Sequence, residues 1–211
     1  MHMEEALAMS NVIRVARPAD VAAIAAIYAH YVSDTVISFE MIPPSEDEIA
    51  RRLAKTLARF PWLVAVRDGE VAGYAYAGAH SERAAYQWSA DVSVYLHKDL
   101  HRRGIGRALY TPLFAILRAL GYINVYAGVT LPNPASVGLH EAMGMTPVGV
   151  YRHVGYKAGA WHDVGWWEGP LQELTADPSS PRAFQDAAPI AIWDSWLASG
   201  ELPPRGPGNT P

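Results

Sequence analysis

The sequence His-Arg-Arg-Gly-Ile-Gly-Arg-Ala at residues 101–108 is the stretch that decides the fold we expect. It follows an apolar run typical of a strand, residues 92–96, and it opens a segment with helical periodicity. Glycine has no Cβ atom to hold a ligand away from the backbone, and the free N–H groups at a helix N-terminus attract anions. The arginines add mobile positive charge. The stretch therefore predicts a turn that holds a phosphorylated ligand.

The spacing of the glycines separates this turn from two common phosphate-binding designs. A P-loop needs lysine and a hydroxyl residue after its last glycine, and neither follows Gly106. A dinucleotide fingerprint needs a third glycine where this chain has Leu109. The remaining pattern, Arg-x-x-Gly-x-Ala, falls on Arg103, Gly106 and Ala108. On this motif alone, a glycine-containing turn with a solvated basic face stays open as the alternative.

Composition limits the classes of protein that fit. The chain has 211 residues, 50% of them hydrophobic, which suits one domain with extensions. A net charge of -4 argues against a general nucleic-acid binder. The absence of cysteine excludes disulfides, thiolate metal sites and an acyl-cysteine intermediate. Because the start lacks signal-peptide features and no segment approaches about 18 apolar residues, we expect a cytoplasmic protein without a membrane partner.

The domain boundaries follow from changes in composition. We expect a flexible leader at residues 1–10, one domain at residues 11–172 and a proline-rich extension at residues 173–211. Within the extension, an apolar stripe that includes Trp193 and Trp196 makes a short helix near residues 189–198 a candidate. That helix would pack on the domain or on a partner subunit, and a disordered tail is the alternative.

Periodicity and turn signals predict alternating strands and helices. The expected elements are a strand at 12–15, a helix after Asp20, a helix from Ser45 to before Pro61, a hairpin at 62–66 and 71–76, a strand at 87–96, a helix after the glycine turn, a strand at 123–129, a helix at 133–143 and strands at 146–154 and 164–168. Asp20 is a candidate N-cap, and Ser45 with Glu48 has capping-box spacing. Pro112 predicts a kink near Ala108.

Several further stretches resemble one protein family, in order and with similar spacing. They are Phe-Pro-Trp-Leu-Val-Ala (60–65), Ala-Tyr-Gln-Trp (85–88), Leu-Pro-Asn (131–133), Leu-His-Glu-Ala-Met-Gly (139–144), Gly-Tyr-Lys (155–157) and Trp-His-Asp-Val-Gly (161–165). Over about residues 12–170 the chain resembles the phosphinothricin N-acetyltransferase branch of the GNAT superfamily. The resemblance implies an α/β fold, with a mixed central sheet splayed at an acetyl-CoA site and helices on both faces. It also implies a homodimer.

The implied reaction moves acetyl from acetyl-CoA to the amino group of a small amino acid-like molecule, such as phosphinothricin, methionine sulfone or methionine sulfoximine. The amine must lose a proton before it attacks the thioester. Asp91 stands where the resemblance places a glutamate as general base, and it is one methylene shorter, which favours a water relay. His140 stands where the resemblance places a proton donor to the CoA sulfur. A structural carboxylate and a buried helix histidine are the respective alternatives.

The resemblance also assigns the donor contacts. The pantetheine amides would meet the backbone of Val94, Tyr95 and Leu96, one of whose N–H groups would polarise the acetyl carbonyl. Asn133 and Ser136 would lie beside the thioester. The pyrophosphate would be bound by the turn residues Arg102, Arg103, Gly104, Ile105, Gly106 and Arg107.

For the acceptor, the resemblance points to Phe39, Tyr76, Arg83 and Tyr86. Arg83 would grip a carboxylate or phosphinate through paired hydrogen bonds, and a solvated loop arginine is the alternative. Ser81 replaces a lysine of phosphinothricin-specific enzymes, which predicts low activity on that compound. No metal is expected, because no third ligand completes a site with the pair His97 and His101.

Two other functions remain open from the sequence. The first is an acetyltransferase for a peptide N-terminus or a polyamine, which would need an open groove in place of a closed pocket. The second is a non-catalytic CoA-binding protein, in which the shorter Asp91 has cost activity. A panel of amines assayed by release of the CoA thiol separates them.

Overall fold

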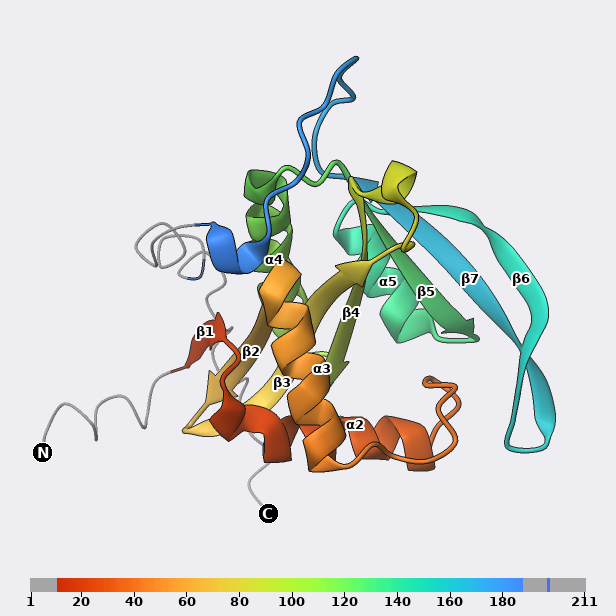
Figure 1. The fold of residues 1–211 in the computed structure, drawn as a ribbon. Helices are drawn as coiled ribbons and strands as arrows, with labels where there is room; N and C mark the ends of the chain where they lie inside the picture. The colour runs from red at the N-terminus through yellow and green to blue at the C-terminus, as the bar shows by residue number, and fades with distance from the viewer. Residues whose placement is uncertain (1–10, 188–196, 198–211) are drawn as a thin grey trace, which may run out of the picture.

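The computed structural model describes residues 11–187 and Leu197, and its helices lie on both faces of a mixed sheet (Figure 1). The strands are β1 (Val12–Val15), β2 (Trp62–Arg67), β3 (Glu70–Ala79), β4 (Ser89–Leu96), β5 (Asn124–Leu131), β6 (Thr146–Lys157) and β7 (Ala160–Pro170). The α-helices are α2 (Val21–Ser33), α3 (Glu46–Arg59), α4 (Ile105–Leu120) and α5 (Pro134–Ala142). Short 3-10 helices are η1 (Pro18–Asp20), η2 (Ala84–Tyr86), η3 (Lys98–Leu100) and η4 (Phe184–Asp186). The predicted order of strands and α-helices is confirmed.

The sheet is splayed at its centre. Its strand order in the described residues is β1-β2-β3-β4-β5-β7-β6, and every neighbouring pair is antiparallel except β4 and β5. These two strands pair over only three positions, the last of them Asp91 opposite Tyr126. Beyond this point β4 continues to Leu96 and β5 to Leu131 without pairing to each other. The predicted splay is therefore confirmed, and it opens a wedge between the two strands.

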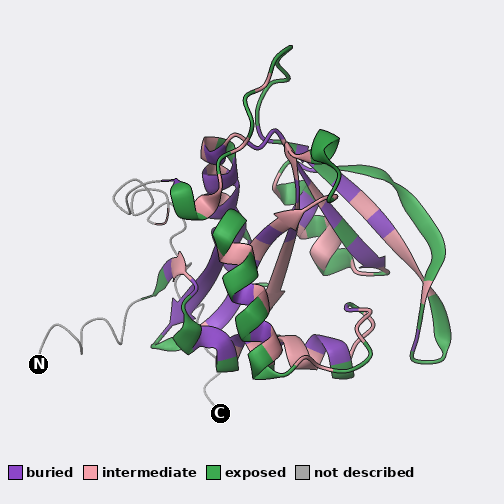
Figure 2. Cartoon of the chain, in the orientation of Figure 1, coloured by how far each residue is buried: buried purple, intermediate pink, exposed green. Residues whose placement is uncertain are grey.

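Two apolar cores hold the helices against the sheet. On one face α4 buries a stripe that includes Leu109, Leu113 and Ile116, each completely enclosed. On the other face α2 and α3 cover β2 and β3, and Ile24 and Ile49 are buried there. Figure 2 shows the buried residues concentrated in the central strands and in the inner faces of these helices.

The helix starts follow the predicted caps in one case and differ in the other. Ser45 accepts a hydrogen bond from the Glu48 N–H, as expected of an N-cap, but the Glu48 carboxylate pairs with Arg52 instead of returning to Ser45. Asp20 does not cap α2: its carboxylate accepts hydrogen bonds from the guanidinium of Arg14 and the N–H of Arg17. The carboxylate of Asp20 binds Arg14 of the first strand and is therefore not available to cap the helix.

Pro112 lies inside α4, and the helix is continuous from Ile105 to Leu120. The missing N–H leaves one helical hydrogen bond unmade, and the side chain is buried in the main core. The helix therefore passes through the proline without ending, and the kink expected near Ala108 stays a prediction.

Strands β6 and β7 are longer than predicted and form an arm that extends beyond the body of the sheet (Figure 1). We call this hairpin, residues 146–170, the β6–β7 arm. Lys157 near its tip is buried and donates hydrogen bonds to the carbonyls of Val32 and Ser38, at 2.6 and 2.7 Å. The ring of Phe39 lies directly against Gly155. These contacts tie the arm to the end of α2 and the loop after it.

The first part of the predicted extension packs on the domain. Trp88 donates from its indole nitrogen to the carbonyl of Ser179, and Arg182 bonds to carbonyls at the end of α4. Ala187 is buried, and Leu197 packs against the main core. The leader at 1–10 and the rest of the candidate helix near 189–198 lie outside the described residues.

The Lys157 contact is testable through stability. In Lys157→Met the Val32 and Ser38 carbonyls lose their charged donor, so we expect the free energy of unfolding to fall by about 1–3 kcal/mol. Urea denaturation measures this. Lys98→Met, at an exposed lysine, is the control and is expected to change stability by less than about 0.5 kcal/mol. Equal stability of the two variants would contradict the anchoring role.

Candidate active site

Two concave spaces lie near the C-terminal half of β4. The first, which we call the splay cleft, occupies the wedge between β4 and β5 and has a volume of about 60 Å³. Among its lining residues are Val94, Tyr95, Asn133, Ser136 and His140. The structure therefore brings together five of the residues that the sequence assigned to the donor thioester and its pantetheine arm. A narrow wedge edged by unpaired strand backbone suits an extended ligand that carries amide groups.

The backbone of Leu96, which the sequence assigned to the pantetheine amides, has hydrogen-bond partners within the chain. Its N–H donates to the Tyr31 hydroxyl at 3.2 Å, and the same hydroxyl donates to its carbonyl at 2.8 Å. Nε2 of His101 lies 2.8 Å from that hydroxyl. The Leu96 backbone is thus already hydrogen-bonded within the chain, and Tyr31 links the end of β4 to the start of the glycine turn. Val94 and Tyr95, the other two residues of this strand end, line the splay cleft.

The glycine turn has the geometry expected of an anion site. Arg102 and Gly104 have positive φ angles of 59° and 74°, and residues 101–104 are exposed. The first backbone hydrogen bond of α4 is donated by Ala108 to the Gly104 carbonyl. The amides of Ile105, Gly106 and Arg107 therefore have no carbonyl within the helix to bind, and they lie at its positive end. These residues fit a diphosphate.

The two glycines of the turn serve different purposes. Gly104 takes the left-handed conformation that begins the helix, which residues with a Cβ atom adopt only at a cost. Gly106 is buried, and a Cβ atom there would lie 2.9 Å from a methyl group of Leu139 on α5. Gly106 therefore allows α5 to pack closely on α4, a role that the motif alone did not reveal.

His140 lies at the inner end of the splay cleft in a chain of hydrogen bonds. Its Nδ1 lies 2.7 Å from the Ser136 carbonyl, to which it must donate, and its Nε2 lies 3.2 Å from the Tyr110 hydroxyl. Burial lowers the pKa of His140, although the bond to Ser136 opposes this. The imidazole is therefore neutral near pH 7, and its Nε2 faces the Tyr110 hydroxyl. This arrangement favours a relay over a permanently charged donor.

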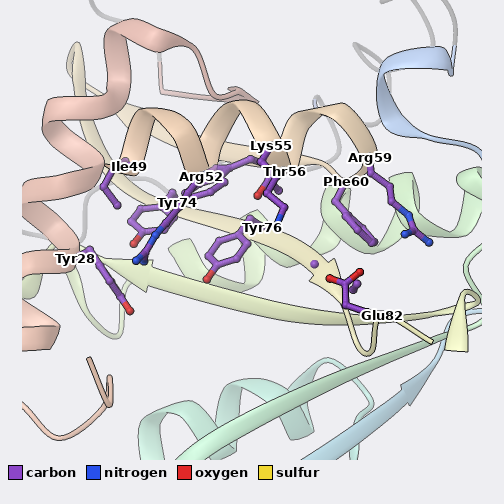
Figure 3. Close-up of a pocket in the computed structure, with 13 residues that line it drawn as sticks. Tyr28, Ile49, Arg52, Lys55, Thr56, Arg59, Phe60, Tyr74, Tyr76 and Glu82 are labelled. Carbon is purple, nitrogen blue, oxygen red and sulfur yellow. The ribbon is translucent and has the colours of Figure 1, made fainter. Parts of the chain in front are cut away.

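The second space is a cavity of about 340 Å³ between α3 and the sheet, which we call the α3 cavity (Figure 3). Its floor is formed by aromatic rings of β2 and β3, with Trp62 and Tyr76 stacked at 4.4 Å between centroids. Its wall on α3 carries Arg52, Lys55 and Arg59. An aromatic floor with a cationic wall suits a small molecule that bears an anionic group.

The cations of this wall differ in how far they are engaged. Arg52 binds Glu40 at 2.6 Å and Glu48 at 2.7 Å, and the Tyr28 hydroxyl donates to the same Glu40 carboxylate. Lys55 makes no ion pair with any residue in the described part of the chain. Arg52 therefore fixes the shape of the wall, and Lys55 keeps its charge available for a ligand.

Asp91 lies on β4 opposite Gly78 of the α3 cavity and next to Val92 of the splay cleft. Its side chain lies on the same face of the sheet as that of Ser93, which lines the splay cleft. Asp91 pairs with Gly78 and Ser93 pairs with Tyr76, so this is also the sheet face that forms the floor of the α3 cavity. Burial raises the pKa of Asp91, although its 2.7 Å contact with His80 opposes the rise. A partly desolvated carboxylate between two binding spaces is a candidate for proton transfer.

The predicted acceptor residues are not all brought together. Tyr76 lines the α3 cavity, whereas Arg83 is exposed and Tyr86 lies against His80. Phe39 packs between the β6–β7 arm and the loop after α2, 6.2 Å from the ring of His162. Their roles in binding an acceptor stay predictions.

Sequence reasoning missed the basic wall of α3 and the histidine beside Asp91. Arg52 and Lys55 lie on the polar face of an amphipathic helix, where charged residues are ordinary. His80 lies in no motif, and only the pairing of β3 with β4 brings it next to Asp91. The described residues contain no group of three or more histidines and carboxylates suited to a metal.

Comparison with known proteins gives consistent matches over most of the chain. A family model described as an acetyltransferase (GNAT) domain matches residues 13–166. A phosphinothricin N-acetyltransferase of Streptomyces viridochromogenes is 43% identical over 170 residues, which cover 81% of this chain and 92% of that protein. An L-methionine sulfoximine/L-methionine sulfone acetyltransferase of Salmonella typhimurium is 33% identical, covering 78% of this chain and 96% of that protein.

Solved structures agree. A phosphinothricin acetyltransferase from Sinorhizobium meliloti, crystallised in complex with acetyl-CoA, superimposes with a TM-score of 0.78. It is 35% identical in sequence, and the match covers 85% of this chain and 98% of that chain.

The buried state of His140 predicts a pH dependence of stability. The lowered pKa means that below the ordinary value of 6.5 the unfolded chain binds a proton that the folded chain does not, so stability is lost as pH falls. We expect His140→Gln, which cannot titrate, to lose less stability than the wild type between pH 7.5 and 5.5. Urea unfolding at each pH measures this, with His97→Gln at an exposed histidine as the control. Parallel curves for wild type and His140→Gln would contradict it.

Proposed function

This chain belongs to the GNAT acetyltransferase family and is an acetyl-CoA-dependent N-acetyltransferase, and from this premise we propose that its acceptor is the amino group of a small amino acid-like molecule that bears an anionic group. One observation carries the proposal: strand pairing places Tyr76, which lines the α3 cavity, opposite Ser93, which lines the splay cleft, and Asp91 lies two residues before Ser93 on β4. A donor in the first space and an acceptor in the second would have their reacting atoms at that point.

The donor contacts follow from the unpaired backbone. The amides of Ile105, Gly106 and Arg107 would hold the diphosphate, and the edge of β4 at Val94 and Tyr95 would bind the pantetheine amides. Asn133 uses its side-chain oxygen to cap α5 through the Ser136 N–H, which leaves its NH₂ group as a donor beside the thioester. When bound, acetyl-CoA supplies the thioester that the amine attacks.

The charge of the α3 cavity selects among acceptors. Lys55 and Arg59 would attract a carboxylate, phosphinate or sulfonyl oxygen, and the aromatic floor would contact a short side chain. The cavity is lined by the cations Arg52, Lys55 and Arg59 and by one carboxylate, Glu82, so its excess of positive charge would disfavour a polyamine, which carries only positive charge. The relatives named for phosphinothricin and for methionine sulfoximine or sulfone act on molecules of this kind. The volume of about 340 Å³ suits a free amino acid better than a folded protein terminus.

The chemistry needs a proton acceptor and a proton route. The acceptor ammonium group must lose a proton before it attacks, and a carboxylate at Asp91, whose pKa is raised by burial, is a better base than an exposed one. The leaving thiolate would be protonated through the Tyr110–His140 chain at the inner end of the splay cleft. With no cysteine in the chain, transfer would be direct.

The test is a panel of amines assayed by release of the CoA thiol. We expect kcat/KM for methionine sulfone or methionine sulfoximine to exceed that for spermidine and for a short peptide by about 100-fold or more, which corresponds to one well-placed ion pair. Gly104→Val is the control, because its strained turn should weaken acetyl-CoA binding in calorimetry while leaving the α3 cavity intact. Preference for spermidine would overturn the acceptor class, and heat from acetyl-CoA without thiol release would indicate a binding protein.

We also propose that the chain forms a homodimer through the β6–β7 arm. β6 is an edge strand, and the arm exposes large hydrophobic side chains. These are Val148, Val150, Tyr151, Val154, Tyr156 and Trp161. An exposed apolar patch on an unpaired edge favours association with another chain.

The dimer is tested by sedimentation or by light scattering after gel filtration. We expect the wild type to sediment as a dimer and Val154→Lys to shift toward the monomer, because lysine on an edge strand opposes pairing. Val12→Lys, on the opposite edge strand β1, is the matched control and should stay dimeric. A monomeric wild type would overturn the proposal.

Location and metal content stay predictions of the sequence. Among the residues that the structure describes, no helix is long and apolar enough to cross a membrane. We keep a cytoplasmic location and a reaction without metal as part of the proposed function. Unchanged activity after treatment with a chelator would support the second.

A further inference from the structure

His80 and Asp91 form a close pair at the point where the splay begins. His80 follows the last residue of β3, and its Nδ1 lies 2.7 Å from Oδ1 of Asp91. The two side chains are 26% and 37% exposed, so both are partly desolvated and still accessible to a small molecule. Asp91 faces Tyr126 in the last paired position of β4 and β5. The pair therefore stands where the splay cleft opens.

Aromatic residues from three elements fix the imidazole ring. The His80 ring lies 4.5 Å from the ring of Tyr126 on β5, 5.7 Å from Tyr86 on η2 and 6.1 Å from Trp166 on β7, to which it is perpendicular. The titratable groups that face it are Asp91, Tyr86 and Tyr126. In the described part of the chain no residue hydrogen-bonds to its other nitrogen, Nε2. The ring is held in place, and one nitrogen is left without a protein partner.

The contact with Asp91 decides which nitrogen can accept a proton. An ionised carboxylate only accepts hydrogen bonds, so Nδ1 of His80 must carry the hydrogen. In the neutral ring Nε2 then holds the free lone pair. A carboxylate paired in this way orients the ring and stabilises the imidazolium that forms when Nε2 takes a proton. Asp91 has a short side chain, and the imidazole carries the basic atom farther from the strand than the carboxylate itself reaches.

We propose that Nε2 of His80 is the atom that removes the proton from the acceptor amine, and that Asp91 is a positioning residue for His80. The proposal rests on the proposed function and refines one part of it, the identity of the base. The acceptor and the donor are unchanged. Tyr86, which the resemblance assigned to the acceptor, has a contact in this arrangement because it packs on the His80 ring.

The proton and electron balance of the step is simple. Nε2 takes one proton from the acceptor ammonium group, and the freed nitrogen lone pair forms the C–N bond to the thioester carbonyl carbon. The C–S bond then breaks with its electron pair on sulfur, and the nitrogen gives up a second proton. The sulfur takes up one proton through the Tyr110–His140 chain to give the CoA thiol. The imidazolium, stabilised by the Asp91 carboxylate, returns its proton to solvent.

The first test is His80→Asn in the full chain. Asparagine keeps an N–H donor close to the place of Nδ1, facing Asp91, but has no basic nitrogen. We expect kcat to fall about 100-fold or more, as for loss of a general base, with KM for acetyl-CoA within twofold of the wild type. If a general base is lost, kcat of His80→Asn should also depend less on pH at acidic pH than kcat of the wild type. A fall of less than threefold would overturn the proposal and return the role of base to Asp91.

A second variant supplies the missing base from outside. In His80→Ala, added imidazole should restore activity in proportion to the concentration of its unprotonated form, because the Tyr86, Tyr126 and Trp166 rings still border the vacated space. A merely structural role for His80 predicts no such rescue. Absence of rescue in a variant that melts at the wild-type temperature would overturn the proposal.

The matched control is His30→Asn. His30 forms a similar pair with Asp34, at 2.8 Å between Nδ1 and Oδ2, on the exposed side of α2 and outside both binding spaces. We expect its kcat to be unchanged, with or without imidazole. Failure of the proposed function looks different: the wild type itself would release no thiol with any amine, and this result would overturn both proposals.

Discussion

The structure depends on the early end of one strand pairing. β4 and β5 are joined at only three positions, and beyond Asp91 and Tyr126 the backbone N–H and C=O groups along one edge of each strand need other partners. At Leu96 the Tyr31 hydroxyl supplies both hydrogen bonds, which closes the far end of β4. At Val94 and Tyr95 the edge faces the splay cleft, where the amides of acetyl-CoA would complete the pairing. The site is a gap in a sheet that a ligand fills.

The pairing of β4 with β3 determines which side chains of β4 face the α3 cavity. Side chains alternate between sheet faces, so Asp91, Ser93 and Tyr95 share the face that α2 and α3 cover. The Asp91 carboxylate, at the start of the splay, therefore lies on the same sheet face as the floor of the α3 cavity. Ser93, two residues later, borders the splay cleft. The period of one strand would thus bring the proposed donor and acceptor together, and burial at this point is the reason that the pKa of Asp91 is raised.

Structure that depends on adjacent residues was predicted well from the sequence, whereas contacts between distant segments were not predicted. The Ser45 cap, the β2–β3 hairpin and the glycine turn each follow from a few adjacent residues, and all are confirmed. Nothing in the sequence indicates that Tyr31, far earlier in the chain, hydrogen-bonds to the backbone of Leu96. His80 was missed for the same reason, since its partner is fixed by strand register.

A chain of buried and partly buried hydrogen bonds connects the β6–β7 arm to the α3 cavity. Lys157 binds the Ser38 carbonyl, the Ser38 hydroxyl lies 2.9 Å from that of Tyr28, and Tyr28 donates to Glu40. Glu40 in turn holds Arg52 on the cavity wall. Because polar groups in such a chain are costly to leave unpaired, a displacement of the arm has to be accommodated along the whole series. The arm that we propose for dimer formation therefore also helps to set the shape of the α3 cavity.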